Sequence, residues 1–196
     1  MRSITGFRAA LTGSGTRPNL FQIVFAFPTL VQGVGAASGL VSMLAESSAL
    51  PADTLGEIEL PYQGRKTYYP GDRTFEPWTI TIMNDENFLI RDAFELWLSA
   101  LNSHVGNIRS SLAATPSMYC VDGYVQQYSK LDVPSIKQYK MAGAFPTEVG
   151  AMELDWGTNN TIEKFQVTLR YQWWEAVSVN GPTTDGQAMS LESDLL

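Results

Sequence analysis

The chain has 196 residues, of which 44 % are hydrophobic and 17 % charged, and 13 basic against 20 acidic side chains give a formal net charge of −7. This length is enough for one sizeable domain with its own core, and the composition excludes a disordered chain. No cluster of Lys or Arg occurs, which argues against affinity for nucleic acid through phosphate neutralisation. Abundant Trp and Tyr beside so few charges indicate either surface that a partner buries or a large core.

A single cysteine, Cys120, excludes an internal disulfide and fits assembly in a reducing cytoplasm. Because it lies within the strand-like run SMYCVDGYV, we expect a buried and inert thiol. The first residues, MRSITGFRAALTG, lack the apolar region of a signal peptide. No run approaches the roughly 18 apolar residues of a membrane span.

The first third of the chain predicts extended segments with Gly-rich connections. Residues 1–16 are expected to form a flexible N-terminal arm with at most one helical turn at 7–11. Residues 19–27 alternate four apolar side chains on one face and predict a strand. Residues 28–39 are Gly-rich and predict a loop, and 40–47 fit either a strand or a short helix.

Residues 56–72 predict two extended segments that bend at Gln63–Gly64 as a hairpin. Ile58 and Leu60 share one face of the first segment, with Glu57 and Glu59 on the other.

An amphipathic helix is predicted over residues 84–104, directly after a strand at 78–83. Its apolar stripe recurs every three or four residues and consists of Ile90, Phe94, Trp97 and Leu101. Asn84 is a suitable N-cap and Gly106 a suitable stop. Asp85 and Glu86 would then lie in the first turn, where the helix dipole favours carboxylates. We interpret them as capping residues rather than a catalytic pair, because neighbours on a helix point about 100° apart.

Three further strands are predicted at 118–128, 135–145 and 162–173. The last alternates strictly between apolar and polar residues up to Trp173, which is typical of an antiparallel strand with one dry face. One helix among six or seven strands predicts a mainly β (α+β) fold, a sandwich or barrel with a helix packed on it. We expect a single domain over 1–175 and a C-terminal extension over 176–196 that is poorly ordered unless a neighbour holds it.

No sequence motif gives strong evidence for a catalytic, cofactor-binding or metal-binding site. GVGAASG at 33–39 follows a strand at a distance, but no repeated βαβ pattern follows, so dinucleotide binding is a remote alternative. His104 is the only histidine, and at the end of a helix it is expected to contact the last carbonyls. LDWGTNN at 154–160 lacks the acidic spacing of a calcium loop and predicts a hairpin connection. The sequence therefore predicts no catalytic residue, no cofactor and no metal, and no enzyme.

Several segments resemble, in order, the tail tube protein family of T-even-type contractile-tailed bacteriophages: RPNLFQ (17–22), GRKTYYPGDRTFEPWTITIMNDENF (64–88), VQQYSK (125–130) and FPTEVGAMELDWGTNNTIEKFQVTLRYQWWE (145–175). The resemblance covers residues 7–175. It implies two antiparallel sheets in a sandwich or barrel with one flanking helix. It also implies six subunits in a ring with a continuous inner β-barrel, and rings stacked into a hollow tube inside a contractile sheath.

The resemblance implies a structural protein of the virion tail, assembled in the host cytoplasm. Its implied partners are other copies of itself, the sheath protein outside, and baseplate or initiator and terminator proteins at the ends. Tape measure protein and genomic DNA would occupy the lumen without specific binding, and no membrane is involved. Candidate subunit contacts are Arg17, Pro18, Asn19, Phe21, Asp72, Arg73 and Phe75, and candidate lumen-facing residues are Glu46, Glu57, Glu59 and Asp122.

For Asp72 and Arg73 we expect a pair across a subunit junction, with turn chemistry at Gly71–Asp72 as the alternative. Solvated strand faces are the alternative for the four acids.

Two departures from the family pattern leave loop and tail contacts open: a longer Gly-rich segment at 29–39, and about twenty residues past Glu175. Three other functions remain open. The first is the inner tube of a phage-derived injection device that carries protein, and the second is a secreted hexameric ring. The third, from a different class, is a small oxidoreductase built around GVGAASG.

Overall fold

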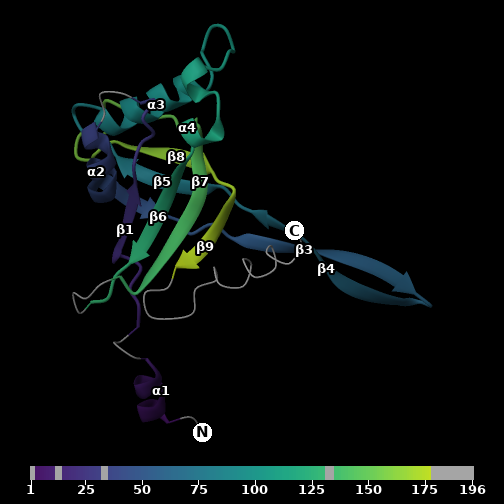
Figure 1. The fold of residues 1–196 in the computed structure, drawn as a ribbon. Helices are drawn as coiled ribbons and strands as arrows, with labels where there is room; N and C mark the ends of the chain where they lie inside the picture. The colour runs from purple at the N-terminus through teal and green to yellow at the C-terminus, as the bar shows by residue number, and fades with distance from the viewer. Residues whose placement is uncertain (1–2, 12–14, 32–34, 131–134, 178–196) are drawn as a thin grey trace.

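The computed structural model describes residues 3–11, 15–31, 35–130 and 135–177. In chain order the elements are α1 (Ile4–Ala10), β1 (Phe21–Phe25), α2 (Gly35–Leu44), β2 (Ala45–Ser48), β3 (Asp53–Tyr62), β4 (Arg65–Phe75), β5 (Trp78–Met83), α3 (Leu89–Leu101), η2 (Ser111–Ala113), α4 (Pro116–Tyr119), β6 (Val121–Gln127), β7 (Lys137–Val149), β8 (Lys164–Arg170) and β9 (Trp173–Val177). Figure 1 shows a β body with α2 and α3 against it and one hairpin extending far from it. None of the described helices is long and apolar enough to cross a membrane.

The body is built around the long strand β7. Strands follow the order β1-β6-β7-β8-β5-β2, and β9 also pairs with β7. The first part of β7 lies between β6 and β9, and its last part pairs with β8. Gly143 marks the change with φ +63 beside a register shift, a conformation that glycine adopts without steric cost. One strand therefore belongs to two antiparallel sheets, β1-β6-β7-β9 and β7-β8-β5-β2.

The core lies between these two sheets and under α3. Its fully buried side chains come from the inward positions of alternating strands and from the helix stripe, as the period of two and the period of 3.6 require: Ile23, Trp78, Ile80, Ile82, Ile90, Phe94, Trp97 and Val167. The rings of Phe25, Phe27, Phe94 and Trp97 pack edge-on, tilted or stacked at centroid distances of 5.1–6.2 Å. The predicted fold class, two antiparallel sheets with a flanking helix, is confirmed.

The flanking helix is shorter than predicted. It begins at Leu89, not Asn84, and ends at Leu101. The N-cap position is Phe88, with φ 54, and not Asn84. Asp85 still caps the helix from outside, because its carboxylate accepts hydrogen bonds from the backbone N–H of Leu89 at 3.1 Å and of Asn87 at 3.3 Å. The interpretation of Asp85 as a capping acid is therefore confirmed, although its predicted place in the first turn is wrong.

The Gly-rich segment is helical from Gly35 onward, where the sequence predicts a loop. The Ser38 hydroxyl accepts a hydrogen bond from the Phe27 N–H at 3.1 Å and ties α2 to the end of β1. Residues 40–47, left open between helix and strand, contain both, since α2 ends at Leu44 and β2 follows. Every strand pair of the described chain is antiparallel, so α2 is not part of a dinucleotide-binding βαβ unit.

Three other boundaries differ from the predictions. α1 spans Ile4–Ala10 instead of one turn at 7–11. The strand predicted from Met118 begins at Val121, because Pro116–Tyr119 form the short helix α4. The strand predicted over 162–173 breaks at Tyr171 and Gln172, where the Gln172 N–H donates to the Ala142 carbonyl at 2.9 Å. The chain then turns into β9, and residues 178–196 lie outside the described part.

Tyr171 provides a pH-dependent contribution to stability. Its hydroxyl donates to the Glu76 carbonyl at 2.7 Å, and burial raises its pKa from 10.0 to about 12. The unfolded chain releases this proton first, so folding is favoured below pH 10 and the contribution is lost as pH rises through 12. We expect Tyr171→Phe to destabilise the protein by about 1 kcal/mol at pH 7 and less above pH 10. Melting curves of both proteins from pH 8 to 12 test this, and parallel curves would contradict it.

Candidate assembly surfaces

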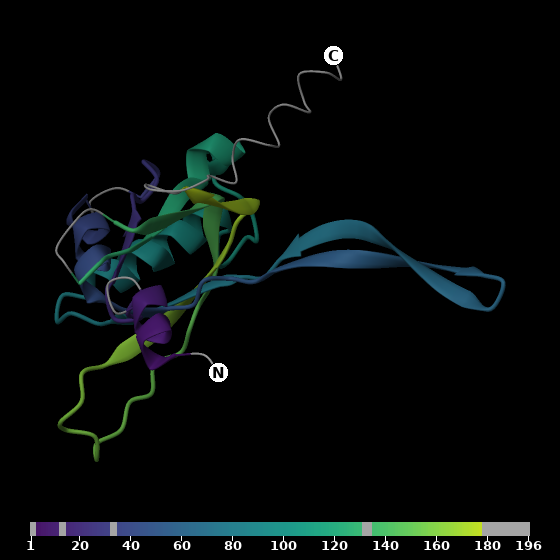
Figure 2. The ribbon, with the colours of Figure 1, turned by 90° about the horizontal axis from the view of Figure 1, so that it is seen from below.

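The β3–β4 hairpin projects from the body as a two-stranded ribbon (Figures 1 and 2). Its register runs from Asp53 opposite Phe75 to Tyr62 opposite Arg65. The turn at Gln63 and Gly64 has φ values of 48 and 81, which matches the twist of two-residue hairpins, and the predicted bend is confirmed. Every residue of β3 is exposed. At about 3.4 Å per residue the ribbon reaches roughly 30 Å.

One face of the β3–β4 hairpin is apolar. Ile58, Leu60, Tyr62 and Tyr69 share it and are 51–69 % exposed. The opposite face carries Glu59, whose carboxylate lies 2.8 Å from the Lys66 ammonium, and one exposed ring, Tyr68, opposite Glu59. A lone two-stranded ribbon is marginally stable in water, and a row of exposed aliphatic and aromatic side chains marks a contact surface. The β3–β4 hairpin therefore has the character of an element that another molecule covers.

The base of the hairpin is fixed to the body. The Glu76 N–H donates to the Ala52 carbonyl at 3.0 Å, and the rings of Phe75 and Tyr171 pack at 6.1 Å. A bulge follows, where Gly56 and Gly71 approach so closely that a Cβ on either would meet backbone of the other strand at 3.1 Å. Gly71–Asp72 thus lies within a strand, which excludes the alternative of turn chemistry there.

The outward face of the β1-β6-β7-β9 sheet carries a polar row together with two exposed apolar side chains, Val24 and Trp173. Gln22, Gln126 and Gln138 stand opposite one another on β1, β6 and β7 and form a glutamine row. The Tyr128 hydroxyl lies 2.6 Å from Oε1 of Gln22 and 2.7 Å from Oε1 of Gln126. Each amide keeps further donors or acceptors for water. Antiparallel sheets commonly pack one face against the core and expose the other face to solvent.

The same face carries a compensated cation. The Lys140 ammonium lies 3.1 Å from the Asp122 carboxylate and 3.9 Å from that of Glu175. The hydrogen bond to Asp122 raises the pKa of Lys140, against the opposing effect of burial. Asp122 also accepts from the Gly143 N–H at 3.0 Å. Two carboxylates around one ammonium leave this group with a net charge of −1.

The predicted subunit contacts lie in two separate places. Arg17, Pro18 and Asn19 form the turn before β1, where the Leu20 N–H donates to the Arg17 carbonyl at 3.3 Å. Phe21 and Phe75 are partly buried against the core of their own chain. Asp72 and Arg73 lie on β4.

Arg73 forms an ion pair within its own chain, with Asp53 at 3.0 Å. Both side chains remain partly exposed, so the predicted pairing with a second subunit stays a prediction.

The four predicted lumen-facing acids do not share a surface. Asp122 lies on the outward face of the β1-β6-β7-β9 sheet. Glu57 and Glu59 lie on the hairpin. Glu46 is on the edge strand β2, with its carboxylate 2.6 Å from the Lys164 ammonium. The glutamine row was not predicted, although VQQYSK contains part of it, because three neutral side chains from distant strands give no sequence signal.

Two other predicted features have structural roles. The LDWGTNN segment connects β7 to β8, as predicted, and the Asp155 carboxylate accepts from the Gly157 N–H at 2.9 Å within its own turn. Burial, with a smaller effect of Asp122, raises the pKa of the partly buried Cys120 thiol, which keeps it protonated and unreactive. His104 is exposed and lies beyond the end of α3.

Comparison with known proteins identifies the family. The family model described as phage tail tube protein matches residues 16–177. The tail tube protein gp19 of Enterobacteria phage T4 is 34 % identical over 168 residues, covering 86 % of this chain and 96 % of that protein. The tail tube protein of Serratia phage KSP90 is 30 % identical over 180 residues, covering 91 % and 98 %.

A solved structure has a similar fold. The chain matches a chain of the sheath–tube complex of an extracellular contractile injection system, PVC, with a TM-score of 0.59 at 14 % identity, covering 91 % of this chain and 100 % of that one. These findings define a β-rich structural protein of the tube-forming class. The chain belongs to the phage tail tube protein family.

Proposed function

We propose that this chain is the protomer of a tail tube, in which six copies close into a ring and rings stack head to tail inside a contractile sheath. The observation that carries the proposal is the β3–β4 hairpin. Beyond its base at Phe75 it buries no side chain in its own domain, yet it presents a row of exposed apolar side chains. Such an element gains stability only when a neighbouring subunit covers it. A head-to-tail contact that does not close on itself grows a filament.

The β1-β6-β7-β9 sheet is the part of the protomer suited to line the bore. Its outward face combines neutral glutamines with the Lys140, Asp122 and Glu175 group, whose net charge is −1. We therefore expect this face not to bind a polyanion. Genomic DNA, and tape measure protein before it, would pass along this wall without specific contacts. The role is structural, with no chemical step and no cofactor.

The partners follow from the tube. Sheath protein surrounds it, and baseplate or initiator and terminator proteins close its ends. The protein is part of the virion tail, and assembly takes place in the host cytoplasm. We place the single tube domain at 1–175, with 176–196 as an extension.

The second candidate is the inner tube of a contractile injection device. The similarity of fold to a chain of the PVC sheath–tube complex favours it, whereas 34 % identity to a phage tail tube protein favours the phage. The contents of native tubes, DNA or protein, distinguish the two.

Negative-stain electron microscopy of the purified protein over a range of concentration and salt tests the proposal. We expect six-fold rings and hollow stacked tubes. If the chain stays monomeric, the microscopy is repeated after a baseplate has been added as a nucleus for assembly. A closed dimer that never forms rings, even with that nucleus, would disprove the tube.

The bore lining gives a separate prediction. Gln126→Lys adds one cation per subunit on the glutamine row, and Gln166→Lys adds the same charge at an exposed position on β8 in the other sheet. We expect rings of Gln126→Lys to bind short duplex DNA on the order of tenfold more tightly at low salt than wild-type rings, with loss of binding as salt rises. Gel-shift titration measures this. Equal gains from both variants would contradict the assignment of this face to the bore.

A further inference from the structure

The connection between β7 and β8, residues 150–163, presents an exposed tryptophan on a preformed turn; we call it the Trp156 loop. Trp156 is 103 % exposed and Leu154 85 %. The Asp155 carboxylate accepts from the Thr158 hydroxyl at 3.2 Å as well as from the Gly157 N–H, and the Thr158 N–H donates to the Asp155 carbonyl at 3.2 Å. A large aromatic side chain held in water on an ordered turn is the usual form of an interface anchor.

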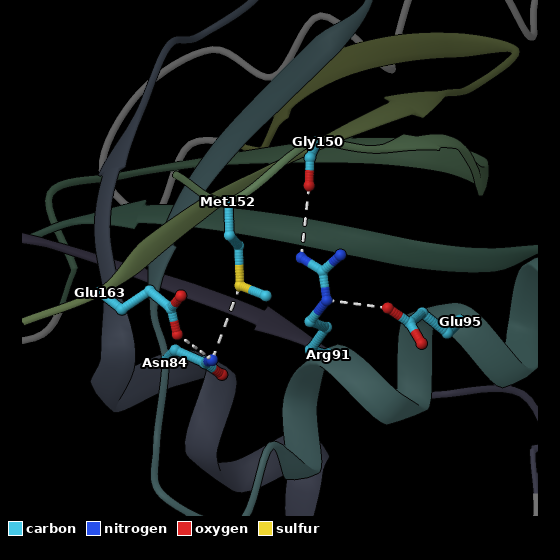
Figure 3. A network of polar contacts seen from close by, with 6 residues as sticks. All are labelled: Asn84, Arg91, Glu95, Gly150, Met152 and Glu163. Carbon is cyan, nitrogen blue, oxygen red and sulfur yellow. Dashed lines mark hydrogen bonds and ion pairs between the residues drawn. The ribbon is translucent and has the colours of Figure 1, made fainter. Parts of the chain in front are cut away.

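Polar contacts fix the base of the Trp156 loop to the N-terminal end of α3 (Figure 3). The Asn84 N–H donates to the Glu163 carbonyl, and the Asn84 side-chain amide donates to the Glu163 carboxylate, both at 2.9 Å. The Arg91 guanidinium donates to the Gly150 carbonyl at 3.3 Å and pairs with Glu95 at 2.8 Å. Both ends of the loop are therefore attached to the body, so a contact by Trp156 costs little ordering entropy.

A hollow lies at the other end of α3; we call it the α3 socket. It has a volume of about 550 Å³ and is lined by Leu98, Leu101, Asn102, Asn107, Arg109, Tyr119, Phe145, Pro146 and Thr147. The Tyr119 and Phe145 rings meet edge-on at 6.1 Å, and Trp97 Nε1 donates to the Tyr119 carbonyl at 3.0 Å. Arg109 lies over the Tyr119 ring at 5.5 Å, and among the described residues it forms no ion pair with a carboxylate.

We infer that Trp156 of one copy inserts into the α3 socket of a neighbouring copy. The loop supplies an aromatic ring flanked by the exposed acids Glu153 and Asp155, and the socket supplies two rings, leucine side chains and the cation of Arg109. The Asn102 side-chain amide donates to Oδ1 of Asn107, which leaves Oδ1 of Asn102 at the socket as the acceptor for the indole N–H. The apolar groups and the charges of the two parts are therefore complementary.

The positions of the two parts determine the kind of contact. The Trp156 loop and the socket lie at opposite ends of α3, whose 13 residues span about 20 Å, and both ribbon views place the loop and α4 on opposite sides of the body. One molecule therefore cannot close the contact on itself. Within the proposed tube, where copies stack head to tail, the contact joins two different surfaces and repeats from copy to copy. This inference rests on the proposed tube, for which it names a joining contact independent of the β3–β4 hairpin.

Cross-linking tests the pairing directly. In a Cys120→Ser background, Asn159→Cys and Thr147→Cys place single thiols on the loop, which keeps Trp156, and at the exposed lip of the socket. With a short bis-maleimide we expect dimers when the two single variants are mixed, and a ladder of oligomers from the double variant. Homodimers of Asn159→Cys alone, or no cross-link in preparations that contain rings, would overturn the inference.

Assembly of tryptophan variants separates this inference from the proposed function. Trp156→Ala is expected to raise the concentration needed for assembly by about tenfold or more, while Trp156→Phe retains most of the contact. Val105→Ala, at a fully exposed position in the loop after α3, is the control and should assemble as wild type. If Trp156→Ala forms normal tubes, the inference fails while the proposed tube function stands. The same conclusion holds if that variant forms normal tubes but no longer binds sheath protein. If wild type forms neither rings nor tubes with a nucleus present, the proposed function itself fails.

Discussion

Replacing Gly123 by valine is expected to destabilise the monomer by about 3 kcal/mol, because the core leaves no room for a side chain there. Gly123 lies on β6 and faces Trp78 of β5 across the two sheets. A Cβ at this position would lie 2.6 Å from Cζ3 of Trp78 and 3.0 Å from its Cη2. The indole cannot withdraw, since Trp78 is fully buried and its Nε1 donates to the Ser48 hydroxyl at 2.8 Å. For a chain of this size the loss corresponds to a fall in Tm of roughly 6–12 °C.

Gly39→Ala is the matched control for this substitution. Gly39 lies in α2 with open space around its missing side chain, so alanine there should stabilise the helix by up to about 1 kcal/mol. Thermal melts of the monomer at low concentration measure both variants. The mechanism is tested by adding Trp78→Phe, which removes the ring atoms that collide. The double variant should lose less stability than the sum of the single changes, and simple additivity would show that the collision is not the cause.

The elements that were predictable are those whose pattern is local. The stripe of Ile90, Phe94 and Trp97 defines a buried helix face wherever the helix packs, and the alternation in β8 does the same for a strand. The capping role of Asp85 also follows from short-range chemistry, although its hydrogen bond reaches Leu89 from one turn outside the helix. The start of the helix was therefore placed five residues too early.

The features that were not predictable depend on where the chain goes. Tyr171 and Trp173 continue one alternating pattern, yet the first is buried and the second 52 % exposed. The alternation shifts by one residue between β8 and β9, beside the irregularity at Gly143 of β7, so that Trp174 and Ala176 face the core instead of Trp173. The sequence predicts the hairpin bend at Gln63–Gly64, but it does not predict how far the hairpin projects from the body. Alternating Ile58 and Leu60 look the same on a ribbon in solvent as on a half-buried strand.

The candidate site shows the same division. Phe21 and Phe75 were predicted as apolar anchors between subunits within RPNLF and GDRTF. In the free chain they are partly buried against their own core, so their role between subunits stays a prediction. The residues left for contacts between copies are apolar side chains that remain exposed after folding, on the β3–β4 hairpin and on the Trp156 loop. Only the folded chain reveals which hydrophobic residues its own core has not used.

The largest effect on assembly is expected from the apolar face of the hairpin. Ile58→Ser combined with Leu60→Ser removes two aliphatic side chains that a neighbouring subunit would bury, each contributing about 1.5–3 kcal/mol on full burial. Both are only about half exposed in the free chain, so a combined loss near 3 kcal/mol per contact is expected, or on the order of a hundredfold in affinity. Because a ring contains several such contacts, rings and tubes should be absent at concentrations where wild type assembles fully. Sedimentation velocity with negative-stain microscopy measures this.

The alternating pattern of β3 supplies a matched control. Glu57→Ser with Glu59→Ser changes the adjacent positions on the opposite face of the same strand, at the loss of one exposed ion pair with Lys66. These variants should assemble close to wild type, and neither pair should alter the Tm of the monomer, because no residue of β3 is buried. Equal loss of assembly from both faces would assign the defect to the ribbon as a whole and not to its apolar face. A lower monomer Tm for Ile58→Ser with Leu60→Ser would mean that the hairpin supports its own domain, which its exposure in the free chain argues against.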